Sequence, residues 1–236
     1  MLGVIGGMGP LATADFFTTL IAATPATRDD DHIPTLILSV PQIPSRPAAI
    51  LRGGPSPLPA LLQVRDLLLA GGATMLAMPC NTAHHWADQM MDGCDVEFID
   101  IVDAVIARIQ PGVVRLGLIA TEATLAALIY ERKLQPRGYQ VLTPDADEYR
   151  DAVQPSIDAV KRVANKEAGR LLEPVVRSLL SRGAERVVLA CTETPIALDA
   201  IESPLRAQCI DSNDALALAC VGAWQRAHAA SAPRLI

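Results

Sequence analysis

A short apolar run that ends in cysteine, Gly72-Ala73-Thr74-Met75-Leu76-Ala77-Met78-Pro79-Cys80, recurs later in the chain as Gly183-Ala184-Glu185-Arg186-Val187-Val188-Leu189-Ala190-Cys191. Two further repeats keep the same order along the chain: Leu2–Ile5 with Leu116–Ile119, and Ile99-Asp100 with Ile210-Asp211. Ordered internal repeats indicate a duplicated structural unit. The sequence therefore predicts two homologous halves of roughly a hundred residues each, a usual size for a folded lobe.

The composition of the 236-residue chain is that of a globular protein. Half of the residues are hydrophobic and 19% are charged, which excludes an intrinsically disordered chain. Aromatic residues make up 3% and the formal net charge is −6, so neither the stacking platforms nor the positive surface of a nucleic-acid binder is expected. The lysines are Lys133, Lys161 and Lys166, which leaves few candidates for a Schiff-base cofactor.

The sequence contains no recognisable targeting or membrane segment. The N-terminus lacks the basic region of a signal peptide, and no stretch approaches the roughly 20 apolar residues of a membrane-spanning helix. Five cysteines, an odd number in a chain of this size, do not suggest a disulfide framework. We therefore expect a cytoplasmic protein with reduced thiols and no membrane or nucleic-acid partner.

Apolar runs alternate with helical patterns in each half. The expected strands are Leu2–Ile5, Thr35–Val40, Thr74–Met78, Val96–Ile99, Arg115–Ala120, Gln140–Leu142, Arg186–Ala190 and Gln208–Ile210. The expected helices are Leu11–Ala23, Pro59–Ala70, Leu125–Leu134, Gln154–Val163, Ala168–Ser181 and Asp214–His228, and Pro41–Pro59 is expected to be a long loop. Such alternation predicts an α/β fold with parallel sheets and right-handed crossovers.

The predicted fold has two pseudo-symmetric lobes, each a parallel four-stranded sheet flanked by helices. The first lobe spans residues 1–103 and the second spans residues 104–211, and a C-terminal helix within 212–236 packs back on the first lobe. Ligands of open α/β sheets bind beyond the carboxyl ends of the strands. The cleft between two such lobes is therefore the expected site.

Cys80 and Cys191 carry the chemistry that this cleft suggests. Each follows a predicted strand and precedes a predicted helix, where free backbone N–H groups and the helix dipole are expected to lower the thiol pKa. A single cysteine is usually a small buried hydrophobic residue. A cysteine that only packs in the core is not expected to recur at both duplicated strand-to-helix junctions. Two opposed thiols can remove a proton from a carbon on one face and deliver one to the other, as in a two-base racemase or epimerase.

Other motifs are weaker. The glycines from Gly3 to Gly9 follow a strand, but their spacing differs from that of a dinucleotide-binding loop. The adjacent His84 and His85 point different ways on a helix, and no second ligand pair has the spacing of a zinc site. Hydrolysis by Cys80 with one of these histidines would leave the second cysteine without a role. We therefore expect no cofactor and no metal.

The chain resembles the aspartate/glutamate racemase family. The motifs that carry the resemblance are Gly6-Gly7-Met8-Gly9-Pro10 with Ala12-Thr13, Asp31-His32, Arg46, Pro79-Cys80-Asn81-Thr82-Ala83-His84, Ala120-Thr121 with Thr124, and Cys191-Thr192-Glu193. The resemblance spans nearly the whole chain. It implies two pseudo-symmetric α/β lobes, a homodimer, and cofactor-independent two-base racemisation of an acidic amino acid, aspartate most of all, with glutamate or a broader range as alternatives.

The resemblance also implies a set of site residues. It identifies Cys80 and Cys191 as the catalytic pair, with Cys80 acting on the D enantiomer. It implies that substrate is bound by Met8, Asn81, Thr82, Thr121, Thr124, Thr192 and Glu193, with Arg46 and Lys161 on the side-chain carboxylate. Arginine suits bidentate carboxylate binding, and a cationic pair suits a dianionic amino acid. Relatives often have glycine at the position of Ala123, so side-chain selectivity at this turn is open.

Two alternatives keep the same fold. Maleate isomerases, hydantoin racemases and arylmalonate decarboxylases are similar in architecture and use one or two of these cysteines. A non-catalytic two-lobed amino-acid binder would need an anion-binding cleft but no thiol. Activity on maleate without racemisation would favour the first alternative, and aspartate binding without exchange of the Cα proton would favour the second.

Overall fold

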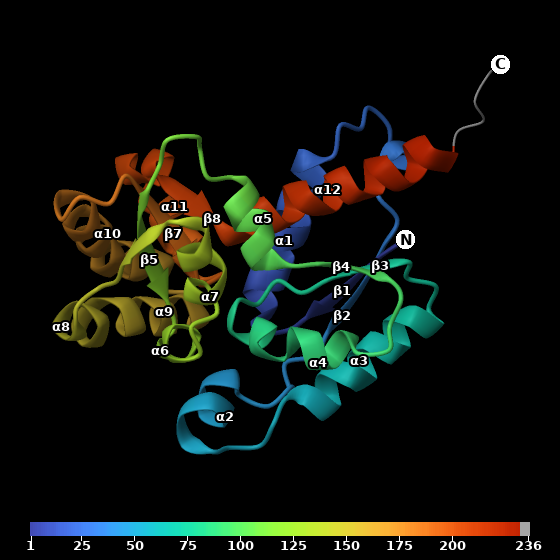
Figure 1. Cartoon of the computed structure of the whole chain (residues 1–236), viewed down its shortest axis with the longest axis horizontal. Helices are drawn as coiled ribbons and strands as arrows, with labels where there is room; N and C mark the ends of the chain where they lie inside the picture. The colour runs from blue at the N-terminus through green and yellow to red at the C-terminus, as the bar shows by residue number, and fades with distance from the viewer. Residues whose placement is uncertain (232–236) are drawn as a thin grey trace.

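The computed structural model describes residues 1–231, and two parallel sheets form its framework (Figure 1). The first sheet has the strand order β2-β1-β3-β4 and the second has the order β6-β5-β7-β8. The strands are β1 (Leu2–Gly6), β2 (Thr35–Ser39), β3 (Met75–Ala77), β4 (Glu97–Ile99), β5 (Arg115–Ala120), β6 (Gln140–Leu142), β7 (Arg186–Ala190) and β8 (Cys209–Asp211). The identical orders confirm the predicted duplication.

Helices cover both sheets. The first lobe contains α1 (Pro10–Ala23), η1 (Asp29–Asp31), α2 (Arg46–Arg52), α3 (Leu58–Ala70), η2 (Thr82–Trp86), α4 (Ala87–Met91) and α5 (Ile101–Ala107). The second contains α6 (Glu122–Ala126), α7 (Glu131–Leu134), η3 (Gln135–Arg137), α8 (Ala146–Glu148), η4 (Tyr149–Val153), α9 (Gln154–Lys161), α10 (Asn165–Ser181), α11 (Thr194–Asp199) and η5 (Pro204–Gln208), and α12 (Ser212–Ser231) follows β8. The two-lobed α/β fold predicted from the sequence is confirmed.

The central strands β1 and β5 are buried on both faces. Every residue of β1 is buried, and so are the last five residues of β5, whereas β2 at a sheet edge is only partly covered. Continuous apolar strands between helical layers are typical of parallel sheets. The eight strand positions read from the sequence therefore match those of residues 1–231 to within a residue or two at each end.

Two predicted elements were wrong in part. The expected loop Pro41–Pro59 contains α2, which Ser45 caps by accepting a hydrogen bond from the Ala48 N–H at 3.3 Å. The expected helix Leu125–Leu134 is divided into α6 and α7, because Leu128 has a φ of 53° in the left-handed region and ends the first segment. In the first case a local cap begins a helix in a segment rich in proline and glycine, and in the second a single residue interrupts the helical pattern.

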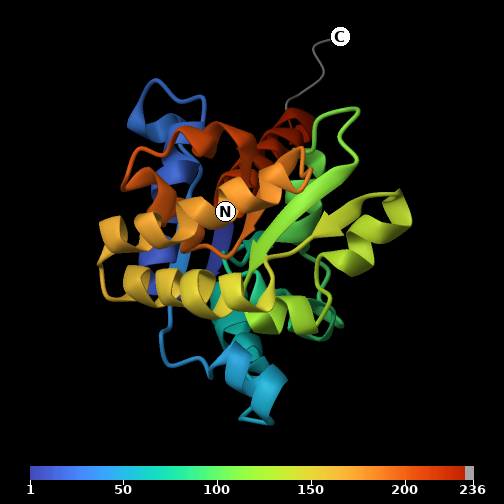
Figure 2. The same cartoon turned by 90° about the vertical axis from the view of Figure 1, so that its left-hand side faces the viewer.

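The two lobes share packing around α12. This helix lies against α1 and α5 of the first lobe, as Figure 1 shows, and the part of the predicted segment beyond Ser231 lies outside the described residues. One continuous apolar cluster joins Leu2 and Phe16 of the first lobe, Leu116 and Val188 of the second, and Leu216 of α12. Viewed along the long axis, α2 extends below the second lobe (Figure 2), and it contacts α6 across the cleft. Among the helices of residues 1–231, none is long and apolar enough to cross a bilayer.

Candidate active site

A cavity of about 230 Å³ lies between the carboxyl ends of the two sheets. Its walls come from the loops after β1 and β3 in the first lobe and after β5 and β7 in the second, as expected for parallel sheets. The lining residues are Gly7, Met8, Gly9, Pro10, Pro41, Arg46, Pro47, Cys80, Asn81, Thr82, Thr121, Ile157, Lys161, Cys191, Thr192 and Glu193. The cavity therefore brings together every site residue predicted from the sequence except Thr124.

The loop after β1, which forms part of the cavity wall, requires a glycine at position 7. Gly7 has a φ of 93°, and a Cβ at this position would overlap the backbone of Val40. Its N–H donates to Thr13 Oγ1 at 2.9 Å, which holds the turn after β1 against the start of α1. Only glycine meets both requirements, so the chain can pass close to the cavity here.

Cys80 and Cys191 line this one cavity from opposite lobes. Cys191 directly follows β7, and Cys80 follows β3 after Met78 and Pro79. Their exposed fractions are 6% and 4%, and both are free thiols. The repeat in the sequence has thus placed one thiol at the equivalent strand end of each lobe.

The expected lowering of the two thiol pKa values was wrong. Burial raises the pKa of Cys80, although the Arg46 guanidinium and the Ala83 N–H oppose this effect. Burial also raises the pKa of Cys191, and the Glu193 carboxylate raises it further, so that it lies well above the ordinary value. Loss of water around a thiolate outweighs the few N–H groups available at these short helical turns.

Glu193 is a buried carboxylate beside Cys191. The thiol of Cys191 donates to Glu193 Oε2 at 3.1 Å, and the Thr192 hydroxyl donates to the same oxygen at 3.2 Å. The other oxygen faces the first lobe, since a Cβ placed on Gly9 would lie 3.6 Å from Glu193 Oε1. Glu193 thus fixes the thiol proton on one side and presents a negative charge to the cavity on the other.

Three threonines form a hydroxyl cluster that joins the two lobes beside the cavity. Thr82 Oγ1 lies 3.0 Å from Thr121 Oγ1 and 2.8 Å from Thr124 Oγ1, and the latter two oxygens are 2.9 Å apart. Thr124 is fully buried and does not line the cavity, so it supports the other two. Ala123 is also fully buried. It does not line the cavity either.

Asn81 ties the loop after β3 to the second lobe and to α12. The Tyr130 hydroxyl donates to Asn81 Oδ1 at 2.6 Å, and Asn81 Nδ2 donates to Ser212 Oγ at 3.0 Å. All three residues are buried, so the bonds are shielded from water. One hydrogen of Nδ2 is left for a ligand in the cavity. Sequence reasoning missed Tyr130 and Ser212, because neither lies in a motif near the cysteines.

We expect Tyr130→Phe to lower the free energy of unfolding by about 2 kcal/mol, because Asn81 Oδ1 would be buried without a donor. The melting temperature of a chain of this size should fall by roughly 4–8 °C, measured by circular dichroism. Tyr149→Phe is the matched control, because the Tyr149 hydroxyl is only partly buried and water can replace its bonds. Equal losses in the two variants would contradict a special role for the Tyr130 bond.

His84 positions the Cys80 loop. Its Nδ1 lies 2.9 Å from the Cys80 carbonyl oxygen, and its Nε2 accepts from the Ile101 N–H at 3.1 Å. Because Nε2 accepts, Nδ1 must donate, and the ring is neutral. Burial lowers the pKa of His84, which also keeps the neutral form. Both ring nitrogens are used within the fold, so His84 orients the loop and is not placed to ligate a metal.

Arg46 and Lys161 give the cavity its positive charge. Arg46 begins α2 and donates from Nη1 to the carbonyl oxygens of Ile43 and Pro44, each at 2.9 Å. Its Nε is buried, with no hydrogen-bond partner among residues 1–231. Lys161 ends α9 with a side chain that is 55% exposed, and its Nζ lies 3.5 Å from Asp158 Oδ1. Arg46 is only partly exposed and has a buried Nε that is free for a ligand, so it is the better-defined anion-binding group.

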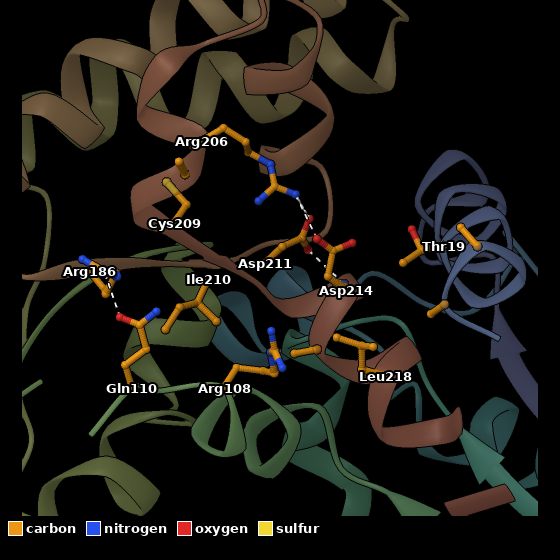
Figure 3. Close-up of a pocket in the computed structure, with 14 residues that line it drawn as sticks. Thr19, Arg108, Gln110, Arg186, Arg206, Cys209, Ile210, Asp211, Asp214 and Leu218 are labelled. Carbon is orange, nitrogen blue, oxygen red and sulfur yellow. Dashed lines mark hydrogen bonds and ion pairs between the residues drawn. The ribbon is translucent and has the colours of Figure 1, made fainter. Parts of the chain in front are cut away.

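A second, larger cavity of about 480 Å³ lies at the other end of the second sheet, beside the first residues of β7 and β8. Figure 3 shows Arg206 directed at Asp211 and Asp214, with Nη2 distances of 2.6 Å and 3.2 Å. Burial raises the pKa of Asp211 to about 7. Burial also raises the pKa of Cys209, the thiol of this cavity, to about 12. This polar cluster joins α12 to the second lobe and lacks the opposed thiols of the first cavity.

Similar proteins agree with this geometry. The structure of Picrophilus torridus aspartate racemase superposes with a TM-score of 0.83 at 32% identity, covering 94% of this chain and 93% of that one. The glutamate racemase of Francisella tularensis, solved with D-glutamate, has a TM-score of 0.68 at 17% identity over 96% and 81%, which shows the shared fold. The Bacillus subtilis broad specificity amino-acid racemase RacX is 27% identical over 95% of this chain and 98% of its own.

Fold, paired cysteines and relatives together define an amino-acid racemase, an isomerase built from two α/β lobes. The matches favour an enzyme over the non-catalytic binder considered from the sequence. Residues 5–220 match the family described as Asp/Glu/Hydantoin racemase, and the chain belongs to that family. The resemblance found in the sequence motifs is thereby confirmed.

Proposed function

We propose that the protein racemises an acidic amino acid, aspartate first and glutamate second, with Cys80 and Cys191 as the two acid–base groups and no organic cofactor. One observation carries the proposal: a thiol from each lobe lines the same small cavity. The aspartate racemase and glutamate racemase among the similar structures support an acidic substrate. The relative named for broad specificity keeps a wider substrate range open.

Two chemically different walls support one orientation of the substrate. The threonine hydroxyls beside Cys80 and the second N–H of Asn81 can donate to an α-carboxylate. Glu193, beside Cys191, can accept from an ammonium group. Cα would then lie between the two sulfur atoms, and Arg46 would hold the side-chain carboxylate. A substrate bound in this way presents one face of Cα to each thiol.

The proposed reaction moves one proton at each face. The Cys80 thiolate removes the Cα proton of one enantiomer and becomes a thiol, while the Cys191 thiol delivers its proton to the opposite face and becomes a thiolate. The other enantiomer reacts by the reverse steps. Hydrogen bonds to the α-carboxylate stabilise the charge that develops between these transfers, and retention of the substrate ammonium stabilises it further.

The surroundings of the two thiols favour different protonation states. Arg46 lowers the pKa of Cys80 against the effect of burial, so its thiolate is the more accessible of the two. Cys191 donates its hydrogen to Glu193, which requires the protonated thiol. Acid–base catalysis needs one group in each state, and this asymmetry supplies them.

Incubation in D2O tests the proposal. After dialysis against a chelator and without added pyridoxal phosphate, L-aspartate and then L-glutamate are each incubated with the enzyme, followed by chiral chromatography and proton NMR. We expect the D enantiomer to appear with deuterium at Cα. Absence of both inversion and exchange with either amino acid would refute the proposal, and turnover of maleate in the same preparation would favour a related isomerase.

The pH dependence gives a second prediction. Replacement of Glu193 by glutamine removes the negative charge that raises the pKa of Cys191, so that pKa should fall. Because Cys191 must carry a proton to act as the acid, the alkaline limb of kcat/KM in that direction should move to lower pH. The variant should also bind aspartate about tenfold more weakly, since the ammonium loses its carboxylate partner. An unchanged pH profile of kcat/KM would contradict this role of Glu193.

A further inference from the structure

The carbonyl oxygens of the two active-site cysteines are held in different ways. The Thr194 hydroxyl, three residues after Cys191, donates to the Cys191 carbonyl oxygen at 2.7 Å. The residue three places after Cys80 is Ala83, which has no hydroxyl, and the Cys80 carbonyl oxygen is bound instead by His84 Nδ1 at 2.9 Å. Cys191 is therefore fixed by its own turn, whereas Cys80 depends on a ring that is itself held from another element.

The start of α5 holds the His84 ring. The Ile101 N–H donates to His84 Nε2 at 3.1 Å. Asp100 is the N-cap of this helix, and its Oδ1 accepts hydrogen bonds from the N–H groups of Val102 at 2.8 Å and Asp103 at 3.0 Å. A capping side chain stabilises the first turn of a helix. The Asp100 carboxylate therefore helps to fix the N–H group that His84 accepts.

Lys133 of the second lobe binds this cap. It lies on α7, which contacts α5 of the first lobe. Its Nζ is 2.8 Å from Asp100 Oδ2 and 2.8 Å from Asp103 Oδ2, and the Lys133 and Asp100 side chains are only 33% and 20% exposed. Three residues earlier, the Tyr130 hydroxyl donates to Asn81 in the loop after β3. The second lobe thus holds the surroundings of this loop at two points.

We propose that Lys133 is a positioning residue that ties Cys80, but not Cys191, to the contact between the lobes. Its ammonium holds Asp100, the cap holds the first turn of α5, and that turn holds His84 against the loop after β3. This inference rests on the proposed two-thiol mechanism. Proton transfer requires the sulfur atom to lie in line with Cα, so a small displacement of the loop slows the Cys80 step.

Lys133 also favours the neutral form of His84 that these hydrogen bonds require. Burial lowers the pKa of His84 and the Lys133 ammonium lowers it further, whereas the carboxylates of Asp100 and Asp103 raise it. The ring packed against His84 from β4, that of Phe98, carries no charge. Without Lys133 the two carboxylates would act unopposed, and the pKa of His84 should rise. A protonated Nε2 cannot accept the N–H of α5, so the loop would lose its support.

Lys133→Met tests the inference. We expect its kcat for aspartate to fall about tenfold, because the Cys80 loop is less well placed. The deficit relative to the native enzyme should grow as the pH is lowered from about 8 to about 6, where His84 gains its proton. Lys133→Arg keeps a cation that can donate to both carboxylates, so it should restore most of the rate. Lys166→Met is the matched control, because Lys166 is exposed on α10 and does not line the cavity.

Primary isotope effects identify the affected thiol. Initial rates are measured with D- and L-aspartate that carry either hydrogen or deuterium at Cα. Slowing the Cys80 step should raise the isotope effect on kcat/KM for the enantiomer that Cys80 deprotonates, expected to be D-aspartate, and lower it for the other. A loss of folded protein would change neither isotope effect, because it only reduces the number of active sites. Circular dichroism of each variant measures that loss separately.

Each result has a defined meaning. Opposite changes of the two isotope effects in Lys133→Met, absent from Lys166→Met, would support the inference. A slower Lys133→Met enzyme with unchanged isotope effects, or with equal changes for both enantiomers, would overturn it and leave the proposed function intact. A native rate in Lys133→Met would overturn it in the same way. Absence of racemisation by the native enzyme would overturn the proposed function and the inference together.

Discussion

Cys80→Ser and Cys191→Ser should each lower the rate of aspartate racemisation by about a thousandfold or more. A serine hydroxyl is nearly as large as the thiol but far less acidic, so the cavity is kept while one acid–base group is lost. Both positions are almost completely buried, which leaves little room for a water molecule to replace the missing group. The rate is measured by chiral chromatography of initial velocities from both enantiomers.

The two variants should also differ from each other. Each keeps one thiol, which can still remove a proton from the face that it contacts and return a deuteron to the same face. In D2O, slow exchange without inversion is therefore expected from one enantiomer with Cys80→Ser and from the other with Cys191→Ser. Cys94→Ser is the control, since Cys94 lies outside the cavity. Near-normal inversion by either active-site variant would exclude the two-base scheme.

The duplicated part of the fold could be predicted because its repeats are visible in short stretches of the sequence. The β3 and β7 repeats each end at a cysteine, and both sheets take the same strand order, so position along the chain already implied position in the cavity. The start of α2 was not visible in the same way. The segment around it, residues 41–59, is rich in proline and glycine, and the Ser45 cap and the contact with α6 across the cleft support the helix.

The surroundings of the site could not be predicted in the same way, because they are formed by residues that lie far apart in the sequence and outside the recognised motifs. Tyr130 reaches Asn81 from the turn before α7 in the other lobe, and Ser212 reaches it from the start of α12. The direction of the thiol pKa shifts was misjudged for a related reason. A strand-to-helix junction is visible in the sequence, but the loss of water around Cys80 and Cys191 depends on how closely the lobes meet.

Arg46→Met should have the second largest effect, lowering kcat/KM for aspartate about a hundredfold. Methionine keeps the aliphatic part of the side chain and removes the charge. Two losses combine in this variant. The side-chain carboxylate of aspartate loses a charged partner, and the Cys80 thiolate loses the cation that lowers its pKa. Because that pKa should rise, the pH at which Cys80 begins to act as a base should move upward.

Comparison with alanine as substrate separates the two losses. Alanine has no side-chain carboxylate, so Arg46→Met should lower its kcat/KM only through Cys80, by about tenfold, with the same upward movement of the acidic limb. Arg52→Met is the matched control, because Arg52 lies on the same helix, is exposed and does not line the cavity. Equal losses for aspartate and alanine would show that Arg46 acts on the thiol alone. A loss for aspartate without a change in the pH profile would show that its unpartnered Nε serves the substrate and not Cys80.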